Sequence, residues 1–349
     1  MRSPAKILAA IAFICVSVTT VGLSSTAQTT RAAASATYDY APRPLKVHQT
    51  LTVAIPNTGL QNAPILLANY FHEFAKENLS VNTVVIPNPG NLPPLATGGL
   101  NIAVIAWAPG VFNAIASGQK LAAIGSPFYA VPGQGFYVQS QYKSCEPGCL
   151  RGKTIAMPAG IGTELATPLA NWLATGHLNL SDVTVLNVAV FSNIPVALTQ
   201  NVAQAAYLVP PFQKALLADG TIKLAQLQAR GTLQGALVEG PSGFSHPQAV
   251  EAFLRALART ELDYLRPGFL HRRGMVNVLA HVLGEPASVV EATDEPVFDP
   301  TLSIRGYGPM IEALQKTWFS IGGLLNYATP LPANRVLNGK LLNAALGPK

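Results

Sequence analysis

The sequence is poor in charge and in cysteine, and beyond its first residues it has no long hydrophobic run. Only 11% of its 349 residues are charged, and three are cysteine. Because 49% are hydrophobic, the chain is too apolar for a disordered protein. Its length is enough to bury a large core, usually in two domains. A later apolar stretch of the ~20 residues that span a bilayer is missing, which excludes a multi-span membrane protein.

Patterns that carry catalysis or bind metals are also missing. The six histidines are scattered, without the paired spacing of a zinc site. No closely spaced carboxylate pair stands out for acid–base chemistry. "SGQK" (117–120) lacks the companion motifs of penicillin-recognising enzymes. The basic residues form no stripe with interleaved aromatics, so nucleic-acid binding is not expected. The sequence therefore predicts no enzyme, no metal and no cofactor.

The N-terminus has the form of a secretory signal peptide. "MRSPAK" is a short basic leader, and an apolar run over 7–23 follows it. Small residues then predict cleavage after Ala27, with Ala36 as a second candidate. A signal peptide over 1–27 predicts a periplasmic or extracytoplasmic protein. The alternative is an uncleaved membrane anchor.

Export determines how the cysteines are interpreted. Cys15 lies inside the predicted signal peptide, which leaves Cys145 and Cys149 in "SCEPGC". In an oxidising compartment these two predict a disulfide across a Glu-Pro-Gly turn. The closed loop is so short that the disulfide stabilises the fold by less than the ~3 kcal/mol of a 15-residue loop. The alternative is two free thiols.

From residue 51 the chain alternates short apolar runs with helical patterns. Strands are expected at 51–55, 80–86, 101–107, 120–126, 153–157, 182–188, 204–209 and 235–240. Helices are expected at 63–77, 109–117, 193–200, 210–218, 246–265, 274–284 and 309–322, and from the glycines at 160–162 to 175. Apolar strands separated by helices predict parallel sheets covered on both faces. Two such α/β blocks predict two lobes, with a ligand site in the cleft between them.

"GIGTEL" (160–165) is the most suggestive local motif. It nearly matches the dinucleotide fingerprint, but Leu165 replaces the third glycine. It also lacks the Lys-Ser/Thr pair of a phosphate-binding loop. What remains is the backbone N–H groups of Gly162 and Thr163, which can bind a carboxylate, sulfonate or hydroxyl at a helix start. The alternative is a structural turn without a ligand.

The order of elements resembles a known family. Four segments carry the resemblance: "LTVAI", "LATGGLNIAVIAW", "LRGKTIAMPAGIGT" and "VLNVAVFSNIPVALTQNVAQAAYLVPPF". Over roughly 46–335 the chain resembles the periplasmic substrate-binding proteins of ABC importers, in the nitrate/sulfonate/taurine/thiamine-precursor group. Asn101 and Gln204 stand where that family has aspartate. The cysteine-rich iron motif of relatives that make the thiamine pyrimidine is absent, which argues against that enzyme activity.

The resemblance implies an α/β type II clam-shell with mostly parallel sheets and flanking helices. It implies a first lobe at 46–139, a second lobe at 140–236 and a return to the first at 237–335. The ligand-binding residues that it and the strand ends predict are Asn57, Gln61, Trp107, Gly162, Thr163, Phe191, Asn193 and Phe212.

The implied function is capture of a small sulfonate-, taurine- or nitrate-like solute by a monomer that delivers it to an ABC permease. A neutral or aromatic solute fits the same residues. The alternatives are an exported enzyme or a ligand sensor built on the same fold.

Overall fold

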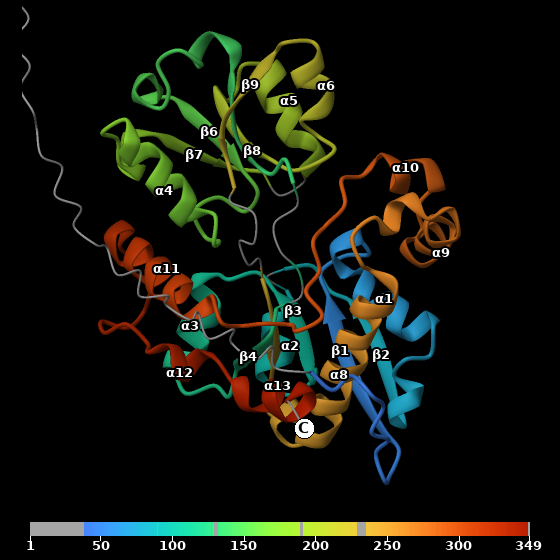
Figure 1. The fold of residues 1–349 in the computed structure, drawn as a ribbon. Helices are drawn as coiled ribbons and strands as arrows, with labels where there is room; N and C mark the ends of the chain where they lie inside the picture. Colours follow the sequence, from blue (N-terminus) through green and yellow to red (C-terminus); the bar gives the residue numbers. More distant parts are fainter. Residues whose placement is uncertain are drawn as a thin grey trace, which may run out of the picture. The chain divides into compact units, whose positions relative to one another are not determined.

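The computed structural model describes residues 38–88, 90–126, 128, 132–188, 191–228 and 235–347. The predicted signal peptide lies outside these residues. Within them the chain forms two five-stranded sheets, each with helices packed on it (Figure 1). We call the first sheet with its helices lobe 1 and the second with its helices lobe 2. No helix in the described ranges is long and apolar enough to cross a membrane.

The sheet of lobe 1 has the order β2-β1-β3-β10-β4. Its strands are β1 (Gln49–Ile55), β2 (Leu79–Val85), β3 (Ile102–Ile105), β4 (Ala122–Gly125) and β10 (Ala236–Glu239). The neighbours β1–β2 and β1–β3 are parallel, whereas β10 is antiparallel to both β3 and β4. Four strands thus point one way, and the strand at which the chain returns to this lobe points the other way.

The sheet of lobe 2 repeats this plan in the order β7-β6-β8-β5-β9. Its strands are β5 (Gly135–Gln139), β6 (Thr154–Met157), β7 (Thr184–Asn187), β8 (Ala205–Leu208) and β9 (Ile222–Leu227). Here β5 is antiparallel to β8 and β9, and β6 is parallel to β7 and β8. The predicted α/β class and mostly parallel sheets are confirmed. Each sheet is mixed because the strand that enters it after a crossing runs antiparallel.

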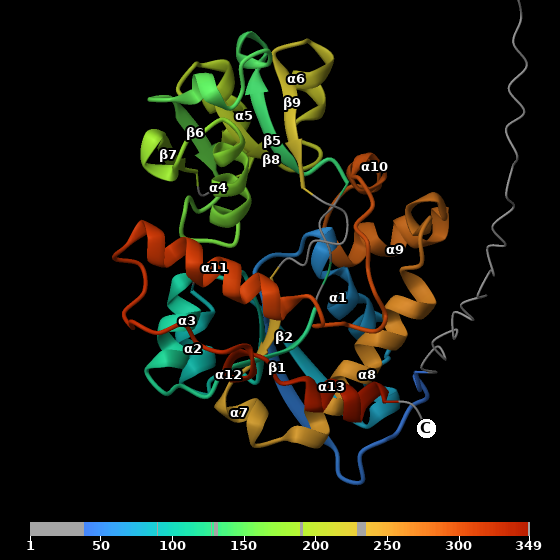
Figure 2. The same ribbon diagram turned by 60° about the vertical axis from the view of Figure 1, so that its left-hand side comes forward.

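Helices cover both faces of each sheet (Figure 2). Those of lobe 1 are α1 (Ala63–Tyr70), α2 (Leu92–Ala96), α3 (Pro109–Ala116), α7 (Pro241–Phe244), α8 (Pro247–Tyr264), α9 (Arg273–Leu283), α10 (Ala287–Ala292), α11 (Tyr307–Ile321), α12 (Ala333–Val336) and α13 (Gly339–Leu346). Those of lobe 2 are α4 (Ala166–Thr175), α5 (Ile194–Thr199) and α6 (Lys214–Ala218).

Strand β1 shows why both faces need cover. Leu51 and Val53 pack with α8 on one face, while Ala54 packs with α3 and α11 on the other. Successive side chains of a strand point to opposite faces, and here both sets are apolar. A sheet with two apolar faces is stable only between two helical layers.

Asn101 and Gln204 have corresponding structural roles in the two lobes. The Asn101 side-chain oxygen accepts a hydrogen bond from the backbone N–H of Thr52, 2.7 Å away. The Gln204 side-chain oxygen accepts one from the backbone N–H of Thr154 at 3.0 Å. In each lobe a side-chain amide oxygen thus accepts from one backbone N–H of a parallel strand, within β1 at Thr52 and at the start of β6 at Thr154. An aspartate would supply an equivalent oxygen, so these substitutions leave the fold intact.

Three secondary-structure predictions need correction. The helix expected over 63–77 ends at Tyr70, because His72 adopts a left-handed φ of 58°. The N–H groups of Glu73 and His72 then bond to the carbonyls of Ala68 and Asn69, which is a Schellman ending made without glycine. The helix expected from the glycines at 160–162 begins only at Ala166. Strands β5 and β9 were not predicted.

Sheet membership also bears on the predicted lobe boundaries. Strand β5, which the sequence assigned to the end of the first lobe at 46–139, pairs with β8 and β9 in the second sheet. In the first sheet β4 ends at Gly125 and β10 begins at Ala236, and in the second sheet β5 begins at Gly135 and β9 ends at Leu227. The C-terminal helix α13 packs on α8 in lobe 1, beyond the predicted end at 335.

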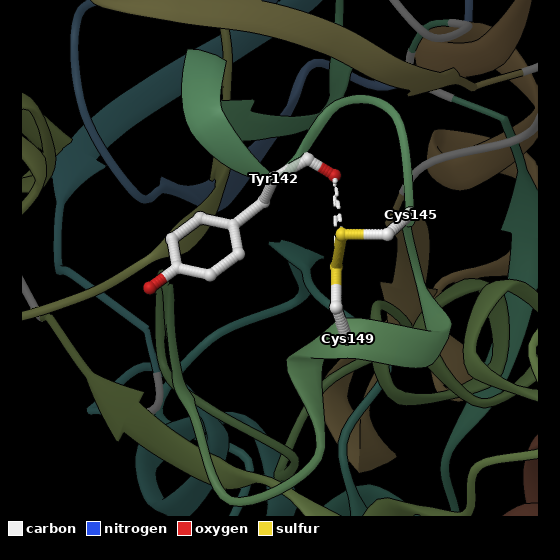
Figure 3. Close-up of a disulfide and its surroundings, with 3 residues drawn as sticks. All are labelled: Tyr142, Cys145 and Cys149. Carbon is white, nitrogen blue, oxygen red and sulfur yellow. Dashed lines mark hydrogen bonds between the residues drawn. A yellow bond between two sulfur atoms is a disulfide. The ribbon is translucent and has the colours of Figure 1, made fainter.

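The predicted disulfide between Cys145 and Cys149 is present in lobe 2 (Figure 3). Its Cα atoms are 5.5 Å apart, and Cys145 Sγ lies 3.5 Å from the backbone oxygen of Tyr142. The bond closes the turn between β5 and β6, as the spacing predicted. Cys15 lies outside the described residues.

Candidate functional site

A cavity of about 320 Å³ lies between lobe 2 and helix α11 of lobe 1. Volumes of this size hold small organic ligands. From lobe 2, the start of α4 and the strands β5, β8 and β9 supply most of the lining. The lining residues are Gly135, Phe136, Glu164, Thr167, Pro168, Asn171, Tyr207, Gln226, Leu227, Gln228, Met310, Ala313 and Leu314.

Among the described residues of that lining, Glu164 is the one with a formally charged side chain. Its carboxylate receives hydrogen bonds from its own backbone N–H and from the backbone N–H of Trp107 in lobe 1. Its Oε2 is buried and has no hydrogen-bond partner among the described residues. Burial raises the pKa of Glu164 to about 7, and the two backbone hydrogen bonds oppose that rise. The Oε2 atom is thus enclosed, while Glu164 as a residue is half-buried and belongs to the cavity lining.

Aromatic packing fixes the lobe 2 wall of the cavity. Phe136 stacks on Trp172 with ring centroids 5.0 Å apart, and it meets Tyr207 edge-on at 5.3 Å. The Tyr207 hydroxyl donates a hydrogen bond to the side-chain oxygen of Gln228. Each ring is thus held by a neighbour, so this wall is largely formed before any ligand enters. A preformed wall lowers the entropy that binding must remove.

The glycine turn at 158–165 holds α4 against lobe 1. Ala159 and Gly160 both take left-handed φ angles, 55° and 62°, which reverse the chain after β6. The Ile161 backbone oxygen then accepts a hydrogen bond from the indole N–H of Trp318 at 3.1 Å. In the first turn of α4, the hydroxyl of Thr167 lies 3.0 Å from that of Thr317. The turn therefore positions Glu164 where both lobes enclose it.

None of the eight ligand-binding residues predicted from the sequence lines this cavity. Of the eight, Trp107 contacts a residue of the lining, because its backbone N–H donates a hydrogen bond to the Glu164 carboxylate. Its ring is buried against Phe112 and Tyr307, and its indole N–H has no partner among the described residues. Gly162 and Thr163 precede Glu164 in the turn, but they do not begin the helix.

The other five predicted residues lie elsewhere. Asn57 and Gln61 bind each other in the turn after β1, through Gln61 Nε2 and Asn57 Oδ1 at 3.0 Å. Phe191 and Asn193 are exposed beside the start of α5, and Phe212 packs on the lobe 2 core next to α6. Their part in ligand binding stays a prediction.

Sequence reasoning missed Glu164, although it lies within the quoted motif. The signal was there: one acid in an otherwise neutral stretch, next to a glycine turn. The contribution of α11 carried no such signal, because Met310 and Leu314 look like ordinary core residues of an amphipathic helix. In the described part of the chain, no three His, Cys, Asp or Glu side chains gather to hold a metal ion.

Comparison with known families decides where the chain belongs. The family model described as "NMT1/THI5 like" matches residues 60–265, which is more than half of the chain. The chain belongs to the NMT1/THI5-like family. The family resemblance predicted from the sequence is thereby confirmed. No curated protein matches the sequence at a significant level.

Solved structures with the same fold include other members of this structural class. The alkanesulfonate-binding protein SsuA from Xanthomonas axonopodis pv. citri is 20% identical, with a TM-score of 0.58, over 84% of this chain and 99% of that one. The periplasmic nitrate-binding protein NrtA from Synechocystis PCC 6803 is 15% identical, with a TM-score of 0.63, over 87% and 89%. The desulfurization enzyme DSZB is 14% identical, with a TM-score of 0.55, over 85% and 99%.

At these identities the similarity establishes the fold, and this NMT1/THI5-like chain has the two-lobed periplasmic-binding fold. The similar structures are mostly binding proteins, and one is an enzyme. Fold similarity leaves the ligand open, because function depends on the site that a fold carries.

Proposed function

We propose that the protein is the extracytoplasmic solute-binding component of an ABC importer, exported by a cleavable signal peptide and acting as a monomer. The observation that carries the proposal is a cavity with walls from both lobes, in a fold shared with the alkanesulfonate-binding and nitrate-binding proteins. The partner would be a membrane permease, and neither nucleic acid nor a cofactor is part of the proposal.

The mechanism follows from the two-lobed lining. A ligand in this cavity touches α4 and β9 of lobe 2 and α11 of lobe 1 at once. Only a conformation that brings these elements together offers all those contacts. The ligand therefore favours that conformation by its difference in affinity for the two states. A permease that recognises the ligand-bound conformation then receives loaded protein in preference to empty protein.

Thermal unfolding against a solute panel tests the proposal. The exported protein is heated with sulfonates, taurine, nitrate, neutral aromatics and organic amines in turn. At a hundredfold excess over its dissociation constant, a ligand adds ~2.7 kcal/mol to the free energy of unfolding. We expect one class of solute to raise the melting temperature by several degrees and to be recovered chemically unchanged. Absence of any shift across the panel contradicts solute binding.

An exported enzyme is the second candidate, and Glu164 is the observation in its favour. A carboxyl with a pKa near 7 in an enclosed cavity has the properties of a general acid or base, and the enzyme DSZB shares the fold. Against it, the cavity lining offers no nucleophile–base pair. Overnight incubation with each bound solute, followed by mass spectrometry, separates the two functions, because an enzyme yields a product.

The eight residues predicted from the sequence remain proposed ligand contacts. Asn57 and Gln61 lie in the turn after β1 of lobe 1, and only a solute long enough to reach that turn would contact them. The variant Gln61→Ala would then weaken the binding of such a long solute but not the binding of a short one.

A further inference from the structure

The lining of the cavity bears on the charge of the solute. Among the residues that the structure describes, the lining contains no lysine, arginine or histidine, and Glu164 and Tyr207 are its ionisable members. The Tyr207 hydroxyl is bound to Gln228. Charged residues on α11 next to the cavity, Glu312 and Lys316, are exposed and are not part of the lining. In the described part of the lining, the one formally charged side chain is thus a carboxyl group, next to the apolar surfaces of Phe136, Leu227 and Met310.

A sulfonate or nitrate is poorly matched to this arrangement. Anions are bound in proteins by cationic side chains or by backbone N–H groups at helix starts. The first residues of α4 face lobe 1, and the nearby backbone N–H groups of Glu164 and Trp107 already bind the Glu164 carboxylate. An anion in the cavity would meet a second negative charge or force Glu164 to stay protonated.

The unpartnered Oε2 of Glu164 points to the opposite ligand chemistry. Oε2 is buried and accepts no hydrogen bond among the described residues, so the free energy lost when it left water is not recovered. A ligand N–H group that donates to Oε2 would recover part of that free energy. A cationic donor adds the stronger attraction of a charge-assisted hydrogen bond. The walls formed by Phe136, Leu227 and Met310 offer apolar surface to the rest of the ligand.

We propose that the solute is an organic cation, an ammonium or amidinium group on an apolar body, with its N–H groups bound to Glu164 and its body against Phe136 and Met310. The side-chain oxygens of Gln226 and Asn171 supply further acceptors at the cavity wall. This inference rests on the proposed solute-binding function and specifies the charge of its ligand. It departs from the sulfonate- or nitrate-like solute that the sequence resemblance implies.

The pH dependence of binding has opposite signs for the two charges. A cation binds ionised Glu164, so its affinity rises as the pH increases through about 7, the pKa of that carboxyl. An amine with a pKa near 10 keeps its charge throughout this range. An anion needs protonated Glu164, so its affinity falls over the same interval. Between pH 8 and pH 5 we expect cation affinity to fall by up to roughly a hundredfold, since each pH unit below the pKa reduces the ionised fraction tenfold.

The test compares three probes with one body: 2-phenylethylammonium, 2-phenylethanesulfonate and 2-phenylethanol. Calorimetric titration of the exported protein at pH 5, 6, 7 and 8 gives each dissociation constant. The variant Glu164→Gln keeps the shape of the side chain and removes its charge. Glu312→Gln removes the same charge from the exposed face of α11 and serves as the matched control. Shorter and longer alkylammonium ions repeat the test for other body lengths.

The expected result is ammonium binding that strengthens from pH 5 to pH 8. Glu164→Gln should weaken it roughly tenfold to a hundredfold, and Glu312→Gln should leave it unchanged. Tighter binding of the sulfonate or the alcohol overturns the proposal for an organic cation while solute binding stands. If the ammonium binds Glu164→Gln as tightly as wild type, the proposal for an organic cation held by Glu164 is overturned while solute binding stands. Binding by none of the three probes or the alkylammonium series, together with no hit in the wider panel, overturns both proposals.

Discussion

Trp318 of lobe 1 donates its indole N–H to the backbone oxygen of Ile161 in lobe 2, across 3.1 Å. The two residues are 157 positions apart in sequence. The same tryptophan meets Phe112 edge-on, with ring centroids 5.4 Å apart. A side chain rooted in the lobe 1 core therefore holds the turn that carries Glu164, and it links the cavity to the packing of α3 and α11.

Trp318→Phe should destabilise the protein by about 1 kcal/mol. Phenylalanine retains much of the ring packing against Phe112 but cannot donate to the Ile161 oxygen, and the net value of such a hydrogen bond is about 1 kcal/mol. Chemical denaturation monitored by circular dichroism measures the change. Since the lost bond joins the lobes, binding of any solute that the panel identifies should also weaken.

Trp172→Phe is the matched control for the stability change but not for binding, because Trp172 packs on Phe136 of the cavity wall. Trp172 is a buried tryptophan of α4 that stacks on Phe136 within lobe 2. Its replacement also removes ring area but leaves the hydrogen bond between Trp318 and Ile161 in place. If Trp318→Phe leaves stability and binding unchanged, the turn is held by other contacts and the positioning argument for Glu164 fails.

The fold could be predicted because its signals are local. Apolar runs such as Leu51–Ile55, separated by helical stretches, specify strands that are covered on both faces. After α4 the chain turns at His177, which has a left-handed φ of 58° and follows Gly176. The equivalent ending at His72 escaped prediction, because no glycine or proline marks it and an unbroken helical pattern continues to Glu77.

The candidate site depends on contacts that sequence does not display. The cavity joins Glu164 to Met310 and Leu314, roughly 150 positions away, and the register of α11 against α4 decides which residues face it. Predicting ligand contacts at strand ends assumes that the strand-end loops line the site. Here the described cavity lies beside β9 and α11, and neither the strand β9 nor the role of α11 was predicted.

A buried ion-pair network ties α8 to the segment after α1. Arg259 Nε lies 2.6 Å from Glu73 Oε2, and its Nη1 lies 2.9 Å from Glu77 Oε1. Arg255 Nη2 binds Glu77 Oε2 at 2.6 Å. Burial would raise the pKa of Glu73, but hydrogen bonds from Lys76, Arg259 and Tyr264, with the charge of Arg259, outweigh it and lower the pKa.

Arg259→Met should destabilise the fold by about 3–5 kcal/mol, because it leaves buried carboxylates without their partner. Arg305→Met, which removes an exposed arginine, should change stability little. Because folding lowers the pKa of Glu73, its ionised carboxylate stabilises the fold at pH values above the ordinary glutamate pKa. That contribution disappears as the pH falls through the pKa of Glu73 in the folded chain. The loss on Arg259→Met should therefore be larger at pH 6 than at pH 3 in urea titrations. If Arg259→Met lowers the free energy of unfolding equally at pH 6 and pH 3, the lost stability does not come from the ion pairs.

The disulfide should contribute little to stability and nothing to solute binding. It links residues four positions apart, and the loop-entropy relation gives about 2 kcal/mol at most for so short a loop. Neither cysteine lines the cavity. In chemical denaturation, the free energy of unfolding of the double variant Cys145→Ser/Cys149→Ser should fall by no more than this amount. Wild type treated with a reductant should have the same free energy of unfolding as the double variant. A loss of solute affinity in the variant would show that the turn is coupled to the site.

Glu239 should make the protein less stable as the pH rises. Burial raises the pKa of this β10 carboxyl to about 7, against the hydrogen bond that Asn338 donates to its Oε1 at 2.8 Å. A carboxyl whose pKa is raised by folding stabilises the fold at pH values below its pKa in the unfolded chain, near 4.5. This contribution disappears as the pH rises through about 7, its pKa in the folded chain. For Glu239 it is on the order of 3 kcal/mol. Burial raises the pKa of Glu261 as well, which acts in the same direction.

Glu239→Gln tests this directly, because the amide keeps an oxygen for Asn338 and never ionises. Its stability should equal that of wild type at about pH 4, below the unfolded pKa, and exceed it at pH 8 by up to about 3 kcal/mol, giving a flatter profile of melting temperature against pH. Glu312→Gln, on the exposed face of α11, should leave the wild-type slope in place. Parallel profiles for Glu239→Gln and wild type would mean that the carboxyl ionises at the same pH in the folded and unfolded chains, and the pH sensitivity would then have to come from Glu261 or Glu164.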